Sequence, residues 1–393
     1  MLDVEDLGFR LAQRAGVPPF YVMRVIDAVV ARRQAGRFVI DLSAGQPSTP
    51  APAAVRAAAQ RAIDTDRIGY TNALGIPPLR EAIAGHYRDR VGLDVDPANI
   101  AVTTGSSGGF LYSFVAAFDV GDTVAMARPG YPAYRNMLTA LGCRVVELPC
   151  GPESRFQPTV AQLEALDEPP AGLIVASPAN PTGTMIAPDE LAALSAWCHA
   201  HGTRLVSDEI YHGITYGIPG TCAWATGRSS IVVNSFSKYF SMTGWRIGWL
   251  LVPDDLVDAV DRLAGNFTIC PPALSQFAAV AAFDAYDELD ANVARYAENR
   301  GRLLAALPAI GLDRLAPADG AFYVYADVSR WTSDSLVWCA RLLDETGVAV
   351  APGLDFDPLD GGRFIRMCFA GDGDEIMRAV EIMGDWLTTQ PIV

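Results

Sequence analysis

The sequence predicts an α/β protein in which a mostly parallel sheet lies between helices, joined to a smaller α+β domain. From about residue 52 to 265, short apolar runs alternate with helical segments, an order typical of parallel sheets covered by helices on both faces. After about residue 285 the order changes to a long charged helix, two strands and two further helices. The 393 residues suffice for two domains, because one core rarely grows past roughly 250–300 residues.

The first expected element is a helix that begins after Pro18-Pro19 and ends near Gly36, with one apolar face formed by Val22, Ile26, Val29 and Val30. A loop at 42–47 follows. Apolar runs predict buried strands at 100–103, 123–127, 144–148, 172–177, 204–207 and 231–234. Helical patterns are expected at 107–118, 132–141, 188–201 and 254–264.

The C-terminal part predicts strands at 321–328 and 363–369, with a helix at 333–346 between them. No repeat, low-complexity tract or flexible linker interrupts the sequence. We therefore expect an N-terminal arm and the first part of the small domain at 1–45, a large cofactor-binding domain at 46–285, and a C-terminal small domain at 286–393.

Composition excludes several classes of protein. Half of the residues are hydrophobic, which suits a large core, and the net charge of −15 argues against nucleic acid or an anionic membrane as partner. No apolar run reaches the ~20 residues that span a bilayer, and the first six residues do not resemble a signal peptide. Seven scattered cysteines without a C-x-x-C pair predict reduced thiols and a cytoplasmic location. We expect no metal, and a packing or surface role for Cys198, His199 and His201.

Polar or glycine-rich clusters follow four of the predicted strands, at 104–109, 177–180, 207–209 and 235–238. Ligands of open α/β sheets bind beyond the carboxyl ends of the strands, so four such clusters predict a single site. In the last cluster, Lys238 follows Ser235 and Ser237 and precedes Arg246 by eight positions. This set suits an anionic aldehyde: the amine forms an imine, while the hydroxyls and the guanidinium bind a phosphate.

Four segments resemble motifs of the class I/II (fold type I) pyridoxal-phosphate (PLP) aminotransferases, in the family's order and spacing. Residues 235–249 resemble its lysine motif, 176–183 its N-P-T-G element, 207–211 its D-E-x-Y element and 363–369 its C-terminal arginine strand. The resemblance covers nearly the whole chain. It implies a fold type I PLP-transferase that uses pyridoxal 5′-phosphate to move an amino group from an L-amino acid to a 2-oxo acid.

The resemblance also implies roles around the cofactor ring. Lys238 would be the Schiff-base lysine and proton carrier, and Asp208 would keep the pyridine nitrogen protonated, so that the ring acts as an electron sink. Tyr211 and Asn180 would hydrogen-bond the phenolic oxygen. Asp208 as a helix cap and Asn180 as a turn residue are the ordinary alternatives.

Further residues are implied at the phosphate and on the faces of the ring. Ser106 and Ser107 open a helix whose free N–H groups suit a phosphate. Tyr131 matches the aromatic that stacks on the ring, with plain packing as the alternative, and Ile210 would cover the other face. Tyr70 matches a tyrosine donated to the phosphate of the neighbouring subunit, which implies a homodimer with shared sites.

Substrate recognition is implied at Arg366, whose planar guanidinium fits an α-carboxylate in bidentate fashion, and at Gly45 and Asn180. Ser107 stands where bacterial aspartate aminotransferases of the family often carry a lysine for a second carboxylate. We therefore expect alanine- or valine-sized donors with pyruvate or 2-oxoglutarate, although aspartate stays open. A PLP-dependent β-lyase shares the lysine, aspartate and arginine, so the motifs leave that alternative open too.

Overall fold

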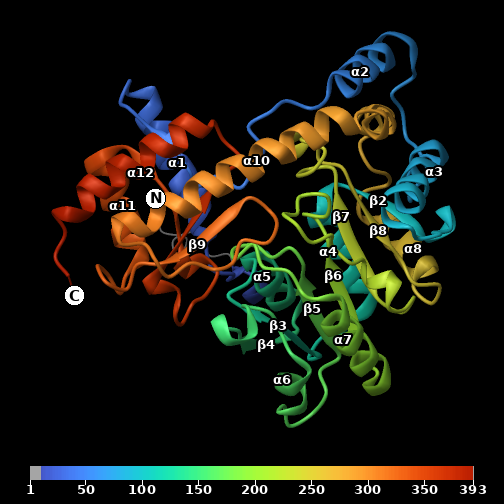
Figure 1. Cartoon of the computed structure of the whole chain (residues 1–393). Coiled ribbons are helices and arrows are strands. Elements are labelled where there is room, and N and C mark those ends of the chain that lie inside the picture. Colours follow the sequence, from blue (N-terminus) through green and yellow to red (C-terminus); the bar gives the residue numbers. More distant parts are fainter. Residues whose placement is uncertain (1–9, 393) are drawn as a thin grey trace.

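A seven-stranded sheet forms the centre of the computed structural model, which describes residues 10–392 (Figure 1). The strand order is β2-β8-β7-β6-β5-β3-β4. Its strands are β2 (Ile100–Thr103), β3 (Thr123–Arg128), β4 (Arg144–Pro149), β5 (Gly172–Ala176), β6 (Arg204–Asp208), β7 (Ile231–Ser235) and β8 (Gly248–Leu251). Only β8 runs antiparallel to its neighbours, β2 and β7. The expected α/β fold with a mostly parallel sheet is confirmed.

The predicted strands of this sheet match the observed ones to within one residue at each end, but β8 was not predicted. Its four residues Gly-Trp-Leu-Leu are all buried. A short apolar run without alternation does not distinguish a strand from other buried backbone, so the sequence alone indicates only the end of the lysine motif here.

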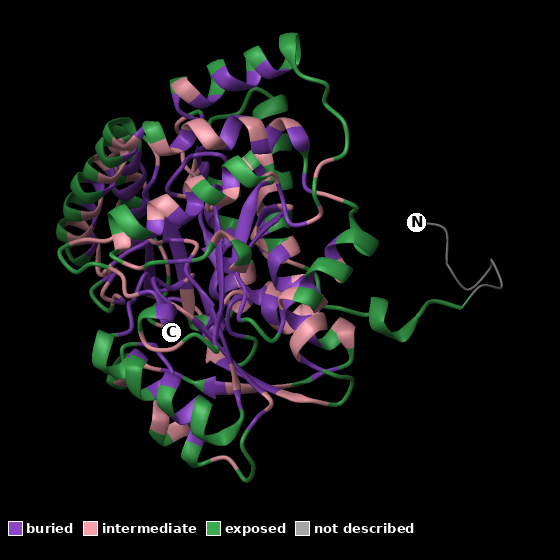
Figure 2. Ribbon diagram, turned by 90° about the vertical axis from the view of Figure 1, so that its right-hand side faces the viewer, coloured by how far each residue is buried: buried purple, intermediate pink, exposed green. Residues whose placement is uncertain are grey.

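Helices cover both faces of the sheet, and Figure 2 shows buried strands at the centre beneath the exposed outer sides of the helices. Four helices agree with the prediction to within three residues: α4 (Gly105–Ala117), α5 (Pro132–Leu141), α7 (Pro188–His201) and α8 (Val257–Phe267). Further helices are α2 (Ala53–Thr65), α3 (Pro77–His86), α6 (Val160–Glu164) and α9 (Ala273–Val280). None of the helices among the described residues is long and apolar enough to cross a membrane.

The remaining elements form a smaller α+β unit. An antiparallel sheet of order β11-β12-β9 contains β9 (Tyr323–Asp327), β11 (Ala351–Pro352) and β12 (Phe364–Cys368). Around it lie α10 (Tyr286–Ala306), α11 (Ser335–Thr346) and α12 (Gly373–Thr388). The parallel pair of β1 (Ile40–Asp41) with β10 (Val348–Ala349) places the N-terminal segment beside the C-terminal one.

Helix α1 (Tyr21–Gln34) joins the small unit. Val22 is buried in a cluster with Tyr325, Ala351 and Phe356, and the side chain of Asp355 accepts hydrogen bonds from the backbone N–H groups of Tyr21 (3.0 Å) and Val22 (2.9 Å). The domain limits at 45 and 285 stay a prediction. The signal-peptide expectation concerns residues 1–6, which lie outside the described residues.

Candidate active site

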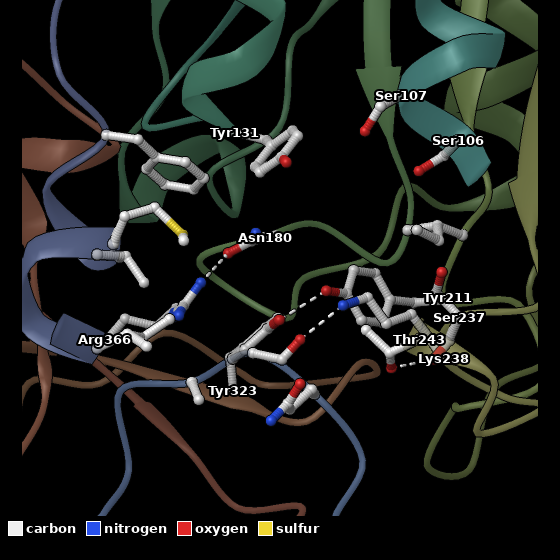
Figure 3. Close-up of a pocket in the computed structure, with 18 of the residues that line it drawn as sticks. Ser106, Ser107, Tyr131, Asn180, Tyr211, Ser237, Lys238, Thr243, Tyr323 and Arg366 are labelled. Carbon is white, nitrogen blue, oxygen red and sulfur yellow. Dashed lines mark hydrogen bonds between the residues drawn. The ribbon is translucent and has the colours of Figure 1, made fainter. Parts of the chain in front are cut away.

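A cavity of about 450 Å³ lies beyond the carboxyl ends of β5 and β6 and after β7 (Figure 3). This volume is in the range of small-molecule sites. The structure brings most of the predicted site residues to its walls: Gly45, Ser106, Ser107, Tyr131, Asn180, Asp208, Ile210, Tyr211, Ser237, Lys238, Arg246 and Arg366. Figure 3 shows Ser106 and Ser107 on one side of the cavity and Arg366 on the other.

Lys238 is the only lysine in the sequence, and its amine lies inside this cavity. The Nζ atom donates a hydrogen bond to the carbonyl of Gly45 at 2.6 Å. Burial lowers the pKa of Lys238 to about 8, and the charges of Arg366 and Arg246 act in the same direction. The neutral amine is the form that attacks an aldehyde and carries a proton, and it is therefore more abundant near physiological pH than in an ordinary lysine.

Asp208 ends β6 and is 5% exposed. Its carboxylate accepts hydrogen bonds from the hydroxyl of Tyr134 and from the backbone N–H of Ile210, the latter at 3.0 Å. Burial raises the pKa of Asp208 to about 6. A cation placed against this carboxylate would stabilise its charged form, so the position suits a protonated ring nitrogen.

One wall of the cavity suits a phosphate. Helix α4 begins at Gly105, where φ is +67°, and its first N–H groups lack partners within the helix. A Cβ atom at this position would contact the guanidinium of Arg246, so glycine allows the arginine and the helix terminus to meet. The hydroxyls of Ser106 and Ser107 line the same wall (Figure 3).

Two predicted cofactor contacts do not line this cavity. Ser235 is 1% exposed; its hydroxyl donates to the carbonyl of Ile247 at 3.1 Å and accepts from the backbone N–H of Ser237 at 3.1 Å. It therefore fixes the turn that carries Ser237, and its expected contact with the phosphate stays a prediction. Tyr70 is 83% exposed and lies outside the cavity, and its expected role in a neighbouring subunit stays a prediction.

Arg366 lies on β12 and is 2% exposed. Its Nη1 donates to Oδ1 of Asn180 at 2.8 Å and its Nη2 to the carbonyl of Ser43 at 2.6 Å. Its buried Nε has no hydrogen-bond partner among the described residues. Two hydrogen bonds thus fix the guanidinium of Arg366, and one of its N–H groups remains without an acceptor. Such a group can bind the carboxylate of a substrate.

The structure adds residues that the sequence patterns did not indicate. Tyr134 binds Asp208, Thr243 and Tyr323 line the cavity, and α1 contributes a wall. The wall consists of Phe20, which directly precedes the helix, and of Val22, Met23, Ile26, Val29, Val30 and Arg33. The apolar face of this helix was identified in the sequence, but that pattern does not tell a core face from the wall of a cavity.

In residues 10–392, no group of three or more His, Cys, Asp or Glu side chains could hold a metal ion. Cys198 is buried, and the ring of His201 stacks on Trp197 with centroids 4.2 Å apart. These two contacts agree with the packing or surface role expected of the segment, and the expectation of no metal stays a prediction.

The donor set fits a phosphorylated aromatic aldehyde. A helix N-terminus with an arginine lies on one side, one amine lies within the cavity, and a buried carboxylate faces the same space. The fold and this site define a PLP-binding transferase.

The comparison with known proteins names the family. The model of aminotransferase class I and II matches residues 37–383, and the chain belongs to this family. It is 60% identical to the valine–pyruvate aminotransferase of Mycobacterium tuberculosis over 97% of this chain and 99% of that protein. It is 36% identical to the aspartate/prephenate aminotransferase of Thermus thermophilus over 90% of this chain and 92% of that protein.

Solved structures agree. An aminotransferase from Mycobacterium tuberculosis has a TM-score of 0.96 at 60% identity, covering 97% of this chain and 100% of that one. The aspartate aminotransferase of Thermus thermophilus with maleate has a TM-score of 0.90 at 32% identity, covering 96% of this chain and 99% of that one. The protein is a PLP-dependent aminotransferase that moves an amino group between an amino acid and a 2-oxo acid. The predicted family, cofactor and reaction class are confirmed.

Proposed function

We propose that this enzyme takes small aliphatic L-amino acids of alanine or valine size as donors and pyruvate or 2-oxoglutarate as acceptor. The proposal rests on the apolar wall that α1 forms in the cavity that Arg366 also lines. Phe20, Met23, Ile26 and Val30 supply it, and the last three follow each other at three- and four-residue spacing, on one side of the helix.

A substrate whose α-carboxylate binds Arg366 places its side chain near this wall. Each methylene group buried there stabilises binding by about 0.8 kcal/mol. A second carboxylate would need a cation, and Ser107 on the opposite wall supplies none. The relative from Mycobacterium tuberculosis is named a valine–pyruvate aminotransferase, which supports the same donor class.

Arg33 ends the α1 wall and is exposed. Its guanidinium supports 2-oxoglutarate as an acceptor beside pyruvate, because the distal carboxylate of that acid needs a cation at the cavity mouth. Aspartate is shorter by one methylene group, so its second carboxylate would fall on the apolar part of the wall.

We assign the residues as follows. When bound, the cofactor supplies an aldehyde and an electron-withdrawing ring. Lys238 holds it and then moves a proton at the substrate α-carbon, while Asp208 pairs with the ring nitrogen and Tyr211 and Asn180 face the phenolic oxygen. The phosphate is bound by Ser106, Ser107, Ser237 and Arg246, with Ser235 supporting the turn; Tyr131 and Ile210 cover the ring; Arg366 and Gly45 bind the α-carboxylate.

We further propose a homodimer with shared sites. Tyr70 and Ile68 line one surface pocket with Thr268 and Cys270; Ile68 and the neighbouring Phe267 and Ile269 are 48%, 51% and 49% exposed. Exposed apolar side chains gathered on one surface are typical of an interface.

We also propose the division into two domains at residues 45 and 285. The seven free cysteines support a cytoplasmic location.

A half-reaction screen tests the donor class. The purified holoenzyme is mixed with one L-amino acid at a time, and loss of the visible cofactor band is followed. Valine and alanine should react fastest, without release of ammonia; ammonia release from a donor with a β-leaving group, such as cysteine, would favour the β-lyase. Exclusive reaction with aspartate would contradict the proposal.

The variant Met23→Arg tests the wall itself. It should lower kcat/KM for valine tenfold or more and raise that for aspartate, because it adds a cation where an apolar side chain stood. Met23→Leu is the control, since it keeps the apolar surface and should change neither value more than about threefold.

A further inference from the structure

Two tyrosine hydroxyls meet inside the cavity, although the motifs pointed to only one of them. Tyr211 lies in the turn after β6, and Tyr323 begins β9. Their oxygens are 2.6 Å apart, joined by a dashed line in Figure 3. Both side chains line the cavity and are 4% and 1% exposed.

A count of protons shows why the direction of this hydrogen bond matters. Burial raises the pKa of Tyr211 and of Tyr323, so both hydroxyls keep their protons. Each hydroxyl has one proton and two lone pairs. One proton lies between the two oxygens, and the other is available to a third group. If Tyr323 is the donor, the available proton is that of Tyr211.

The surroundings of Tyr323 hold its hydroxyl in place against that of Tyr211. Its ring lies beneath the guanidinium of Arg366, 4.4 Å from the ring centroid. A Cβ atom at Gly45 would contact its hydroxyl, so the backbone closes that side. Among the described residues, Tyr211 is the only hydrogen-bond partner of the Tyr323 hydroxyl.

We propose that Tyr323 is a positioning residue: its hydroxyl donates to the Tyr211 oxygen and thereby directs the Tyr211 proton toward the phenolic oxygen of the cofactor. The inference rests on the proposed role of Tyr211. A hydroxyl that accepts one hydrogen bond is a stronger donor in the next. Tyr323 therefore lowers the basicity of the phenolic oxygen without touching it.

The pH at which the visible band of the Lys238-bound cofactor changes reports this effect. The other charged or titratable groups around the tyrosine pair are Asp208, Lys238, Arg366, Cys368 and Tyr131. A variant that removes only the Tyr323 hydroxyl leaves all of them in place, so a shift in the titration is a property of that hydroxyl.

The experiment compares four reconstituted holoenzymes: Tyr323→Phe, Tyr211→Phe, the double variant and Tyr325→Phe. Tyr325→Phe is the matched control, because Tyr325 lies on the same strand and its buried hydroxyl has no partner among the described residues. The phenylalanine at 323 keeps the ring against Arg366, so the KM for the amino donor should stay within about twofold.

We expect Tyr323→Phe to raise the midpoint of the absorbance titration by roughly half a pH unit to one unit. A shift of this size corresponds to the net free energy of one neutral hydrogen bond. Tyr211→Phe should raise it more, and the double variant should equal Tyr211→Phe because the two hydroxyls act in series. Tyr325→Phe should leave it unchanged.

An unchanged midpoint in Tyr323→Phe, with a raised one in Tyr211→Phe, would overturn the inference and leave the proposed function standing. No shift in Tyr211→Phe would instead remove the role assigned to Tyr211. Additive shifts in the double variant would show that Tyr323 acts independently of Tyr211 and also overturn the inference. If Tyr323→Phe does not fold, Gly45→Ala displaces the same hydroxyl and should raise the midpoint in the same direction.

Discussion

At the scale of residues, the chemistry depends on the environment of one amine. An ordinary lysine has a pKa near ~10.4, whereas burial lowers that of Lys238 to about 8. The neutral amine is the nucleophile, so a lowered pKa makes the reactive form abundant at lower pH.

This shift predicts how the apoenzyme captures its cofactor. The rate of growth of the visible band after mixing with PLP should rise with pH and level off above about pH 8, because the amine is then mostly neutral. Stopped-flow mixing from pH 6 to 10 measures it. A rate that is still increasing between pH 9 and 10 would show an unperturbed lysine.

The residues that could be predicted from sequence are those within short motifs, such as Lys238, Asp208 and Arg366. Tyr134 and Tyr323 could not be predicted, because they hydrogen-bond partners that are 74 and 112 positions away in the chain. Nothing local in the sequence indicates such contacts. Ser235 was indicated by its motif, but its hydrogen bond with the carbonyl of Ile247 depends on the fold of the turn.

At the scale of elements, the N-terminus of α4 and the whole of α1 form the two walls of the site. The first could be anticipated from its strand–glycine–serine–helix order. The second could not, since α1 makes its cavity contacts only after the small unit has positioned it.

The glycine at the start of α4 gives a prediction for cofactor affinity. Gly105→Ala should weaken PLP binding tenfold or more, because the added Cβ atom contacts the guanidinium of Arg246. Gly202→Ala is the control. The φ of Gly202 is +68°, so an alanine there meets the same backbone strain as at Gly105, where φ is +67°, but no other atom lies within 4 Å of the added Cβ. Equilibrium dialysis measures the PLP affinity of both variants. Equal losses would show that backbone strain, and not the contact with Arg246, weakens cofactor binding.

The attachment of α1 gives a prediction for substrate affinity. Asp355→Ala removes both acceptors of the Tyr21 and Val22 N–H groups and should raise the KM for valine several-fold while the cofactor spectrum is unchanged. Asp372→Ala removes the equivalent cap of α12, which binds two N–H groups at 3.0 Å. Both variants should lose about 1 kcal/mol of unfolding free energy, but a KM change in Asp372→Ala as well would contradict a special role for α1.

At the scale of the whole molecule, the fold class could be predicted from the alternation of apolar runs with helical segments. Strands of a parallel sheet are buried on both faces, so they appear in the sequence as continuous apolar runs. The pairing of β1 with β10 could not be predicted, since those two-residue strands are separated by most of the chain. Arg366 of the small unit and Lys238 of the large one line one cavity.

The proposed dimer predicts the mass of the protein in solution and a loss of PLP affinity in a Tyr70 variant. Size-exclusion chromatography with light scattering should give twice the chain mass of 42.0 kDa. Tyr70→Phe should keep that mass and weaken PLP binding several-fold, because it removes a hydroxyl donated to the partner's phosphate site. Full affinity in this variant would contradict the sharing of sites, and a monomeric wild type would contradict the dimer.

The most direct test of the account uses the fact that Lys238 is the only lysine. The holoenzyme is treated with borohydride, which reduces the bond between an amine and the cofactor aldehyde, and is then digested and analysed by mass spectrometry. The account predicts the mass of the reduced cofactor on the peptide that contains Lys238 and none in Lys238→Ala. A label on the N-terminal amine alone, or no label in active enzyme, would contradict it.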